Sequence, residues 1–580
     1  MTTNQTSPAT RRGFLLSCGA VAASTAWPGR ASSGPQAEPA EPRDLSDMIP
    51  RAEGTGPPIT QATLAEAEKL AAVEFTEAER AVILKGIKDD VARYQRRRSQ
   101  ALANHLAPAT VFDPRLPSVQ IDAESRPIFR SKIDPGPLPT DDQDIAYAPV
   151  TSLSRWIERG DLSSLRLTKI YLDRLKRIGP KLQCTITLTP ERALSQARRA
   201  DQEIAERRYR GPLHGIPWGA KDLFDTAGIK TTWGANPYKG RLPKTDAAAV
   251  RRLDDAGAVL VAKLALGALA YGDIWFDGRT NNPWKLDQGS SGSSAGSAAA
   301  TAAGLIAFSL GTETLGSIVS PCMRCGATGL RPTFGRVART GAMALCWSLD
   351  KIGPICRTVE DCALVLSAIN GPDADDPASL SIPFNFDATQ AVKGMRVGYS
   401  PKWFQGDAAT DLDRRVLEVA RSAGLQLIEI ELPDWPYDAL MTILLVEAAA
   451  CFEELTLNNR DDELVWQEPE AWPNTFRQTR FVPAIEYVQA QRFRRSVMEM
   501  MAAKFADLDA MISPSFAGSL LLITNNTGHP SLTLRCGYKD DGTPHGITLW
   551  GRLFDESTLC SIGMSLERKL DVWHKRPKIV

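Results

Sequence analysis

The stretch that decides the fold reads Gln288-Gly-Ser-Ser-Gly-Ser-Ser-Ala-Gly-Ser297 and continues as Ala298-Ala-Ala-Thr-Ala-Ala-Gly304. A Gly/Ser run by itself is most often a flexible linker. Here the run leads directly into small residues that predict a helix with almost no side-chain bulk. Such a helix can pack closely against a sheet, and its N-terminus presents unpaired N–H groups beside the serines. We therefore interpret this stretch as the start of a buried helix.

Two further segments contain residues suited to nucleophilic chemistry. Residues 215–222 read Gly-Ile-Pro-Trp-Gly-Ala-Lys-Asp, so Lys221 lies among apolar and small residues. A lysine in such a place is most often exposed, but burial would lower its pKa and make the neutral amine available as a base. Residues 305–310 predict a strand that ends in a Gly-rich turn carrying Ser317. Consecutive N–H groups in such a turn can form an oxyanion hole.

Alternation of helix and strand patterns continues along the chain. Helical periodicity covers 152–178 and 191–207, and apolar runs predict strands at 258–262, 395–399, 426–431 and 531–538. This alternation favours an α/β layer architecture.

Together the three segments resemble the amidase-signature family of serine amidases. Similar stretches run from about Leu213 to Gly335, including Asn282-Pro-Trp284 and the block Gly329-Leu-Arg-Pro-Thr-Phe-Gly-Arg336. Weaker matches extend the resemblance over about 150–570. The resemblance implies an α/β fold in which a large mixed β-sheet is sandwiched by α-helices, and it implies hydrolysis of a carboxamide C–N bond.

The resemblance also implies roles for individual residues. Lys221 matches the family's base, Ser293 its bridging serine after a cis peptide bond, and Ser317 its nucleophile. Neutral Lys221 would take the Ser293 proton while Ser293 takes the Ser317 proton, and Ser317 would form an acyl-enzyme that water hydrolyses. The oxyanion-hole amides fall on four consecutive residues, Thr314, Leu315, Gly316 and Ser317.

The turn around Ser317 departs from the family pattern. The family usually has Asp-Thr-Gly-Gly-Ser-Ile-Arg, whereas this chain has Glu-Thr-Leu-Gly-Ser-Ile-Val over 313–319. Leu315 replaces a glycine, which restricts positive φ, and Val319 replaces an arginine that anchors the turn. Either substrate access is narrowed or the oxyanion hole is misaligned. An amidase-fold protein that binds a ligand without turnover therefore stays an alternative.

Two other functions are weighed against this one. Gly292-Ser-Ser-Ala-Gly296 matches the nucleophile elbow of α/β-hydrolases, but that motif needs a preceding strand and a later histidine. Residues 281–289 are predicted as a loop, and His529, His545 and His574 are the later histidines. An amidotransferase-A-like subunit for charged tRNA has the same fold, but predicted export and neutral charge argue against it.

Composition limits the partners. Lys plus Arg equals Asp plus Glu, at 68 each, so the chain has no basic field to hold nucleic acid or an anionic membrane. No apolar stretch reaches the ~18 residues of a membrane span, so stable membrane insertion is not expected.

Cys322 and Cys325 have CxxC spacing, but no second CxxC or spaced His pair completes a metal site. We expect buried thiols, no metal, no cofactor, and a small-molecule or peptide amide as substrate.

The N-terminal part is expected to be an addition to the main domain. Arg11-Arg12 before a short apolar run is typical of a twin-arginine signal, which predicts export to the periplasm or the exterior. Helical spacing from Leu64 to Ala103 predicts two helices that break near Phe75, with Thr76 as an N-cap. This segment is either an added arm or the contact of a possible homodimer. The predicted divisions are 1–33 signal peptide, 34–57 disordered linker, 58–106 helical extension, 107–149 connector and 150–575 catalytic domain.

Overall fold

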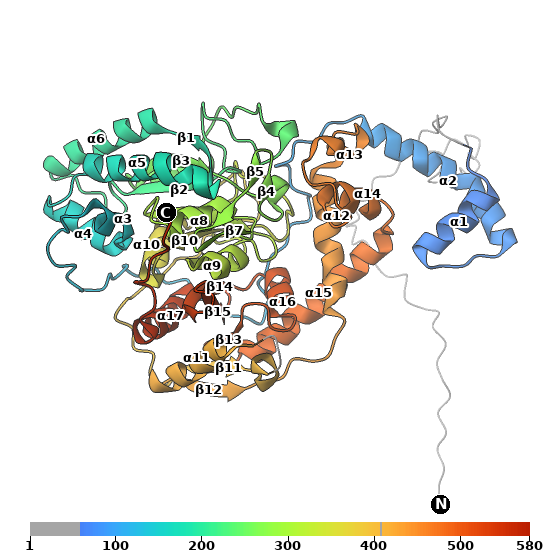
Figure 1. Cartoon of the computed structure of the whole chain (residues 1–580). Coiled ribbons are helices and arrows are strands. Elements are labelled where there is room, and N and C mark those ends of the chain that lie inside the picture. Colours follow the sequence, from blue (N-terminus) through green and yellow to red (C-terminus); the bar gives the residue numbers. More distant parts are fainter. Residues whose placement is uncertain (1–57, 406–408, 580) are drawn as a thin grey trace, which may run out of the picture.

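The computed structural model describes residues 58–405 and 409–579, so the predicted signal and linker lie outside the described residues. A mixed sheet of 11 strands forms the centre of the molecule (Figure 1). The strands follow in the order β1 (Thr185–Leu188), β3 (Val259–Leu264), β2 (Pro217–Lys221), β8 (Phe308–Glu313), β10 (Lys351–Cys356), β9 (Thr328–Arg331), β14 (Ser531–Tyr538), β15 (Pro544–Gly551), β13 (Ala510–Pro514), β11 (Arg396–Tyr399) and β12 (Gln426–Glu429).

Helices cover both faces of this sheet, which confirms the predicted fold class. Neighbouring residues of β3 enter different core clusters: Val259 and Val261 pack in one, and Leu260 packs in the other. The helices are α3 (Asp142–Tyr147), α4 (Val150–Arg159), α5 (Ser164–Leu182), α6 (Pro190–Ala205), α7 (Ala248–Asp255), α8 (Ala295–Ala302), α9 (Val319–Cys325), α10 (Val359–Ile369), α11 (Asp411–Ser422), α12 (Met441–Cys451), α13 (Glu453–Leu457), α14 (Trp472–Thr479), α15 (Ala484–Phe505), α16 (Leu520–Thr527) and α17 (Glu556–Leu570).

The central strands bring the predicted site residues to one edge of the sheet. β2 runs parallel to β8, with Trp218 opposite Phe308. Lys221 is the last residue of β2, and the Ser317 turn follows the last residue of β8. Because the carboxyl ends of parallel strands meet at the same edge, Lys221 and this turn lie close together.

Three predicted boundaries are wrong in detail. The strand predicted at 305–310 is β8 at Phe308–Glu313, because its hydrogen-bonded register with β2 starts at Phe308. The helix predicted at 152–178 is two helices, since Gly160 ends α4 at a φ of 82° and Ser163 caps α5. The loop predicted at 281–289 contains a two-stranded hairpin, β6 (Asn281–Asn282) and β7 (Lys285–Gly289), which lies outside the main sheet.

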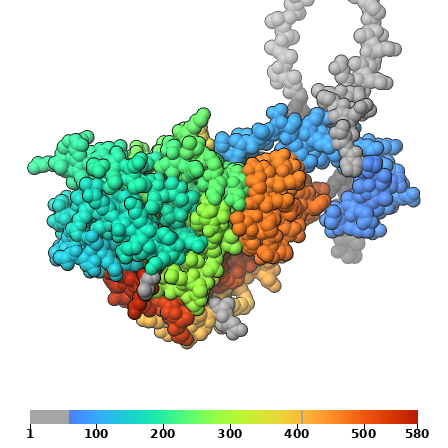
Figure 2. Space-filling model, turned by 45° about the horizontal axis from the view of Figure 1, so that its top comes forward, coloured from blue at the N-terminus to red at the C-terminus, as the bar shows by residue number. Residues whose placement is uncertain are grey.

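The predicted N-terminal helices are α1 (Gln61–Ala71) and α2 (Glu77–Arg98), which we call the arm. Thr76 caps α2 in a capping box with Glu79, which confirms the predicted break. The arm projects beyond the rest of the molecule (Figures 1 and 2), and an ion pair of 2.7 Å between Arg97 and Glu453 joins it to α13. No helix within 58–405 and 409–579 combines the length and apolar character that a membrane span requires.

Candidate functional site

The Lys221 ammonium is fully buried at the end of β2 and is surrounded by hydroxyl groups. Its Nζ lies 2.8 Å from Ser293 Oγ, 2.8 Å from Thr312 Oγ1 and 3.1 Å from Ser294 Oγ. Burial disfavours the charged form and lowers the pKa of Lys221 to about 7, against an opposing effect of Asp350 and Glu313. A neutral amine is therefore accessible near neutral pH, next to Ser293.

Ser293 and Ser294 are placed by the close approach of α8 to the sheet. The peptide bond between Gly292 and Ser293 is cis. All eight residues of α8 are buried, and a Cβ at Gly296 would lie 2.2 Å from the carbonyl oxygen of Cys184. Only small residues permit this packing, which supports the interpretation of the Gly/Ser run as the start of a buried helix.

Ser317 lies in the turn between β8 and α9 and is mostly buried. Its main-chain carbonyl accepts a hydrogen bond of 3.1 Å from Ser294 N–H, which joins the turn to the start of α8. Within the part of the chain that the structure describes, no hydrogen bond joins the hydroxyls of Ser293 and Ser317. The structure thus connects Lys221 directly to Ser293, and connects Ser317 to this pair through the main chain.

The four predicted oxyanion-hole amides are free of internal partners. Across residues 58–405 and 409–579, no acceptor is hydrogen-bonded to the N–H groups of Thr314, Leu315, Gly316 or Ser317. Gly316 has a φ of 84°, whereas Leu315 does not adopt a positive φ. The glycine-to-leucine departure therefore does not strain the backbone, and Leu315 instead packs partly buried against the core.

A buried ion pair anchors this turn in the absence of an arginine at 319. Glu313 accepts from the N–H groups of Ile318 and Val319, and its other oxygen lies 2.6 Å from Arg331 Nη1. Burial opposes ionisation of Glu313, but Arg331, the turn amides and Asn525 outweigh it and lower its pKa to about 2. The carboxylate is thus charged at any working pH and holds both ends of the turn.

Sequence reasoning did not assign roles to Ser294, Thr312, Glu313 and Asp350. Thr314 Oγ1 donates to Asp350 Oδ1 at 2.6 Å, so Asp350 orients the first residue of the turn. Three of these four residues belong to the two motifs that were singled out. The position of Glu313 directly before the turn could have predicted its role, because buried turn amides need an acceptor.

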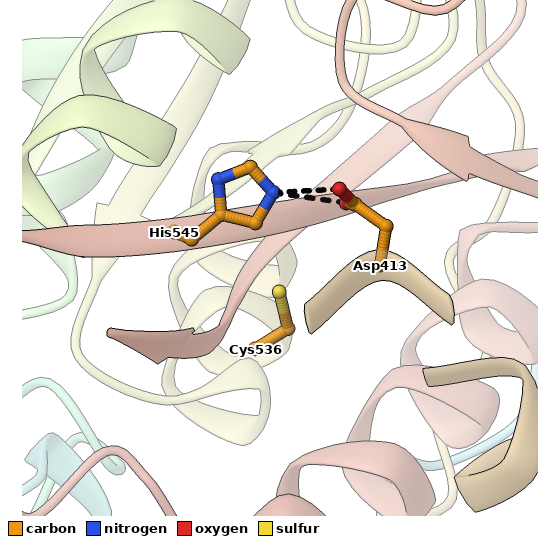
Figure 3. Close-up of side chains that lie close together, drawn as sticks. All are labelled: Asp413, Cys536 and His545. Carbon is orange, nitrogen blue, oxygen red and sulfur yellow. Dashed lines mark hydrogen bonds and ion pairs between the residues drawn. The ribbon is translucent and has the colours of Figure 1, made fainter. Parts of the chain in front are cut away.

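The His, Cys and carboxylate side chains that come closest to a metal-binding arrangement in the described residues lie elsewhere (Figure 3). His545 Nε2 lies 2.9 Å from Asp413 Oδ1, with Cys536 beside them. Asp413 also accepts from the N–H and hydroxyl of Thr410 and closes the capping box of α11. Its acceptor positions are already used, so this cluster ties α11 to β15. Cys322 and Cys325 are buried free thiols, as predicted.

Known proteins are similar to this chain in sequence and in fold. The Amidase family model matches residues 166–523. The chain is 34% identical over 479 residues to the A subunit of the glutamyl-tRNA(Gln) amidotransferase of Roseiflexus castenholzii, covering 74% of this chain and 96% of that one. The structure of the peptide amidase from Stenotrophomonas maltophilia is 30% identical, with a TM-score of 0.66 over 74% of this chain and 98% of that chain. A bacterial aryl acylamidase of the amidase-signature enzymes, 20% identical, shares the fold with a TM-score of 0.67, covering 74% and 99%.

Proposed function

We propose that this chain, which belongs to the amidase-signature family, is an amide hydrolase that cleaves a carboxamide C–N bond through an acyl-enzyme. The observation that carries the proposal is the fully buried Lys221, whose pKa is lowered to about 7 and whose Nζ lies 2.8 Å from Ser293 Oγ. A buried lysine with hydroxyl partners is suited to act as a general base at neutral pH.

The proposed reaction begins at Ser317. Lys221 takes the Ser293 proton, Ser293 takes the proton of the Ser317 hydroxyl, and Ser317 Oγ attacks the amide carbonyl. The N–H groups of residues 314–317 stabilise the oxyanion, because no acceptor among the described residues is hydrogen-bonded to them. Ser293 then returns a proton to the leaving amine, and water hydrolyses the acyl-enzyme by the reverse relay. No hydrogen bond joins Ser293 and Ser317 in the described chain, so this mechanism requires the two hydroxyls to approach when substrate binds.

A second candidate is an amidotransferase-A-like subunit, favoured by the 34% identity that spans 96% of the A subunit of a glutamyl-tRNA(Gln) amidotransferase. We favour a hydrolase that works alone. The peptide amidase is 30% identical over 98% of its length, and the formal net charge of zero offers no general attraction for tRNA. A third candidate, a binding protein without turnover, is weakened because Leu315 does not strain the turn.

A fluorophosphonate probe tests the proposal. Such a probe phosphonylates an activated serine, so we expect labelling of the wild type and of Ser320→Ala, and no labelling of Ser317→Ala. Ser320 is a matched control because it lies one turn further on and, among the described residues, its hydroxyl is hydrogen-bonded to that of Ser291 alone, at 2.6 Å. Absence of labelling and of amide hydrolysis in the folded wild type would favour the binding protein.

We further propose that the protein is exported, on the basis of Arg11-Arg12 and the apolar run that follows. Replacing both arginines by lysine should retain the protein in the cytoplasm. Fractionation of cells that express both forms measures this, and equal export of the two forms would contradict the proposal.

A further inference from the structure

A cavity of about 810 Å³, which we call the Thr314 cavity, reaches the candidate site. Thr312, which bonds Lys221, and Thr314, the first residue of the oxyanion turn, both line it. Another part of its lining is the short segment 103–107, which follows the arm. This segment lies outside residues 166–523, which match the family model.

Asn104 anchors that segment by four hydrogen bonds. Its Nδ2 donates to the carbonyl of Ala344 at 2.9 Å and to that of Cys451 at 3.2 Å, and its Oδ1 accepts from Ala344 N–H at 2.8 Å. Its main-chain carbonyl accepts from Trp347 Nε1 at 3.0 Å. Both ends of the side-chain amide are used, so a carboxylate of the same shape would face two carbonyl oxygens. The segment is therefore fixed in place by an interaction that only an amide side chain makes.

The contacts continue from Asn104 to the oxyanion turn. Next to Ala344, the N–H groups of Leu345 and Cys346 donate to Asp350 Oδ2 at 2.8 and 3.0 Å. The other oxygen of Asp350 accepts from Thr314 Oγ1 at 2.6 Å. Hydrogen bonds and neighbouring residues thus connect segment 103–107 to Thr314, the first residue of the oxyanion turn.

Three arginines of the cavity lining are paired with carboxylates. Arg339 pairs with Asp376 at 3.0 Å, and Arg241 pairs with Asp225 at 2.5 Å. Arg251 pairs with a neighbouring carboxylate, Asp373, at 2.7 Å. Apolar lining residues complete the cavity, namely Leu223, Ala270, Met343, Leu345 and Ile352.

We propose that Asn104 is a positioning residue that closes the Thr314 cavity, and that it restricts the enzyme to compact amides. The inference rests on the proposed function, because it takes this cavity to receive the substrate of Ser317. When the segment is released, the wall opens, so compact amides lose contacts and longer amides gain room.

The test compares kcat and KM for a short aliphatic carboxamide with those for an N-acyl dipeptide amide. We expect Asn104→Asp and Asn104→Ala to raise KM for the short amide about tenfold, which corresponds to about 1.4 kcal/mol, with a smaller change in kcat. The ratio of kcat/KM for the long amide to that for the short one should rise at least fivefold. Trp347→Phe removes only the indole donor and should change this ratio in the same direction. Gln100→Ala, exposed in the same region and not part of the lining, is the matched control.

Fluorophosphonate labelling of Ser317 distinguishes a failure of the role of Asn104 from a failure of the proposed function. If all variants are labelled and active but the ratio of kcat/KM is unchanged, the role of Asn104 is overturned and the proposed function stands. If the folded wild type is neither labelled nor active on either amide, the proposed function fails and this inference fails with it. A wild type that prefers the long amide would also overturn the inference.

Discussion

Lys221 is the last residue of β2 and Lys263 the last but one of the neighbouring β3, and both are fully buried, but they have different surroundings. Lys263 Nζ lies 3.0 Å from Asp222 Oδ1, in a closed ion pair. Lys221 has three hydroxyl oxygens within 3.1 Å, and no described carboxylate is within ion-pair distance of it. An ion pair stabilises the charged form, whereas hydroxyl groups leave the amine free to lose its proton. This difference is the reason that we propose Lys221, and not Lys263, as the base.

Activity should depend on the ionisation of Lys221. Only the neutral amine can accept a proton, so kcat/KM should rise about tenfold per pH unit below pH 7 and level off above it. The measurement is a pH–rate profile with substrate well below KM. A flat profile from pH 5 to 9 would remove Lys221 from the role of base.

Substitution of the two lysines should have different effects on the free energy of unfolding. Lys221→Met should lower kcat/KM by about 10²–10⁴-fold with no loss of stability, because it removes a buried cation that has no counter-charge. Its folded-state pKa of about 7 lies below the ordinary 10.5, so this group costs stability increasingly as the pH falls from about 10 to 7. Lys263→Met should instead cost about 3–5 kcal/mol, because it leaves Asp222 buried and uncompensated. Urea denaturation measures both free energies of unfolding, and equal losses would contradict the distinction.

At the scale of elements, α8 determines whether the hydroxyls reach Lys221. The helix contacts the sheet through residues that are too small to keep it away, and a Cβ on Gly311 of β8 would lie 2.7 Å from Ser294 Oγ. Small-residue packing was predictable from the sequence around 295–304. The boundaries of β8 were not, because register with β2 selects the residues that become strand.

An added methyl group in α8 should therefore displace the serines of the candidate site. A Cβ at Gly296 would lie 2.2 Å from Cys184 O and 2.6 Å from Ala265 N. We expect Gly296→Ala to cost about 1–3 kcal/mol of stability and to lower kcat, because it displaces Ser293 and Ser294. The matched control is Gly86→Ala in α2, where a Cβ meets no atom within 4 Å. That variant should gain about 0.5–1 kcal/mol, and thermal unfolding with the kinetic assay measures both.

At the scale of the whole molecule, the arm and the segment that follows it are expected to have separate roles. The arm carries exposed apolar side chains, among them Leu70, Val73, Phe75 and Val82. Such a surface favours association, so the predicted homodimer stays a prediction that involves the arm. Asn104 instead belongs to the wall of the Thr314 cavity.

Removal of residues 1–98 should separate these roles. We expect the shortened protein to retain kcat/KM within about twofold for a compact amide, because residues 99–580 keep Asn104 and every proposed catalytic group. If the arm forms the dimer contact, light scattering after gel filtration should give a smaller mass than the shortening alone explains. A large loss of activity in a folded, shortened protein would show that the arm itself supports the site.

The sequence alone predicted the fold class, three catalytic side chains and an oxyanion turn. These predictions depend on the resemblance of the Gly/Ser run, the Lys221 segment and the Ser317 turn to motifs of the amidase-signature family, and the structure confirms the fold class. Tertiary structure decided the electrostatics: that hydroxyl groups surround Lys221 whereas a carboxylate pairs with Lys263, that Glu313 and Arg331 anchor the turn, and that Asn104 reaches the cavity wall. These contacts join residues that are 18 to 347 positions apart. Burial and the pairing of charges depend on the packed fold, and no local pattern encodes them.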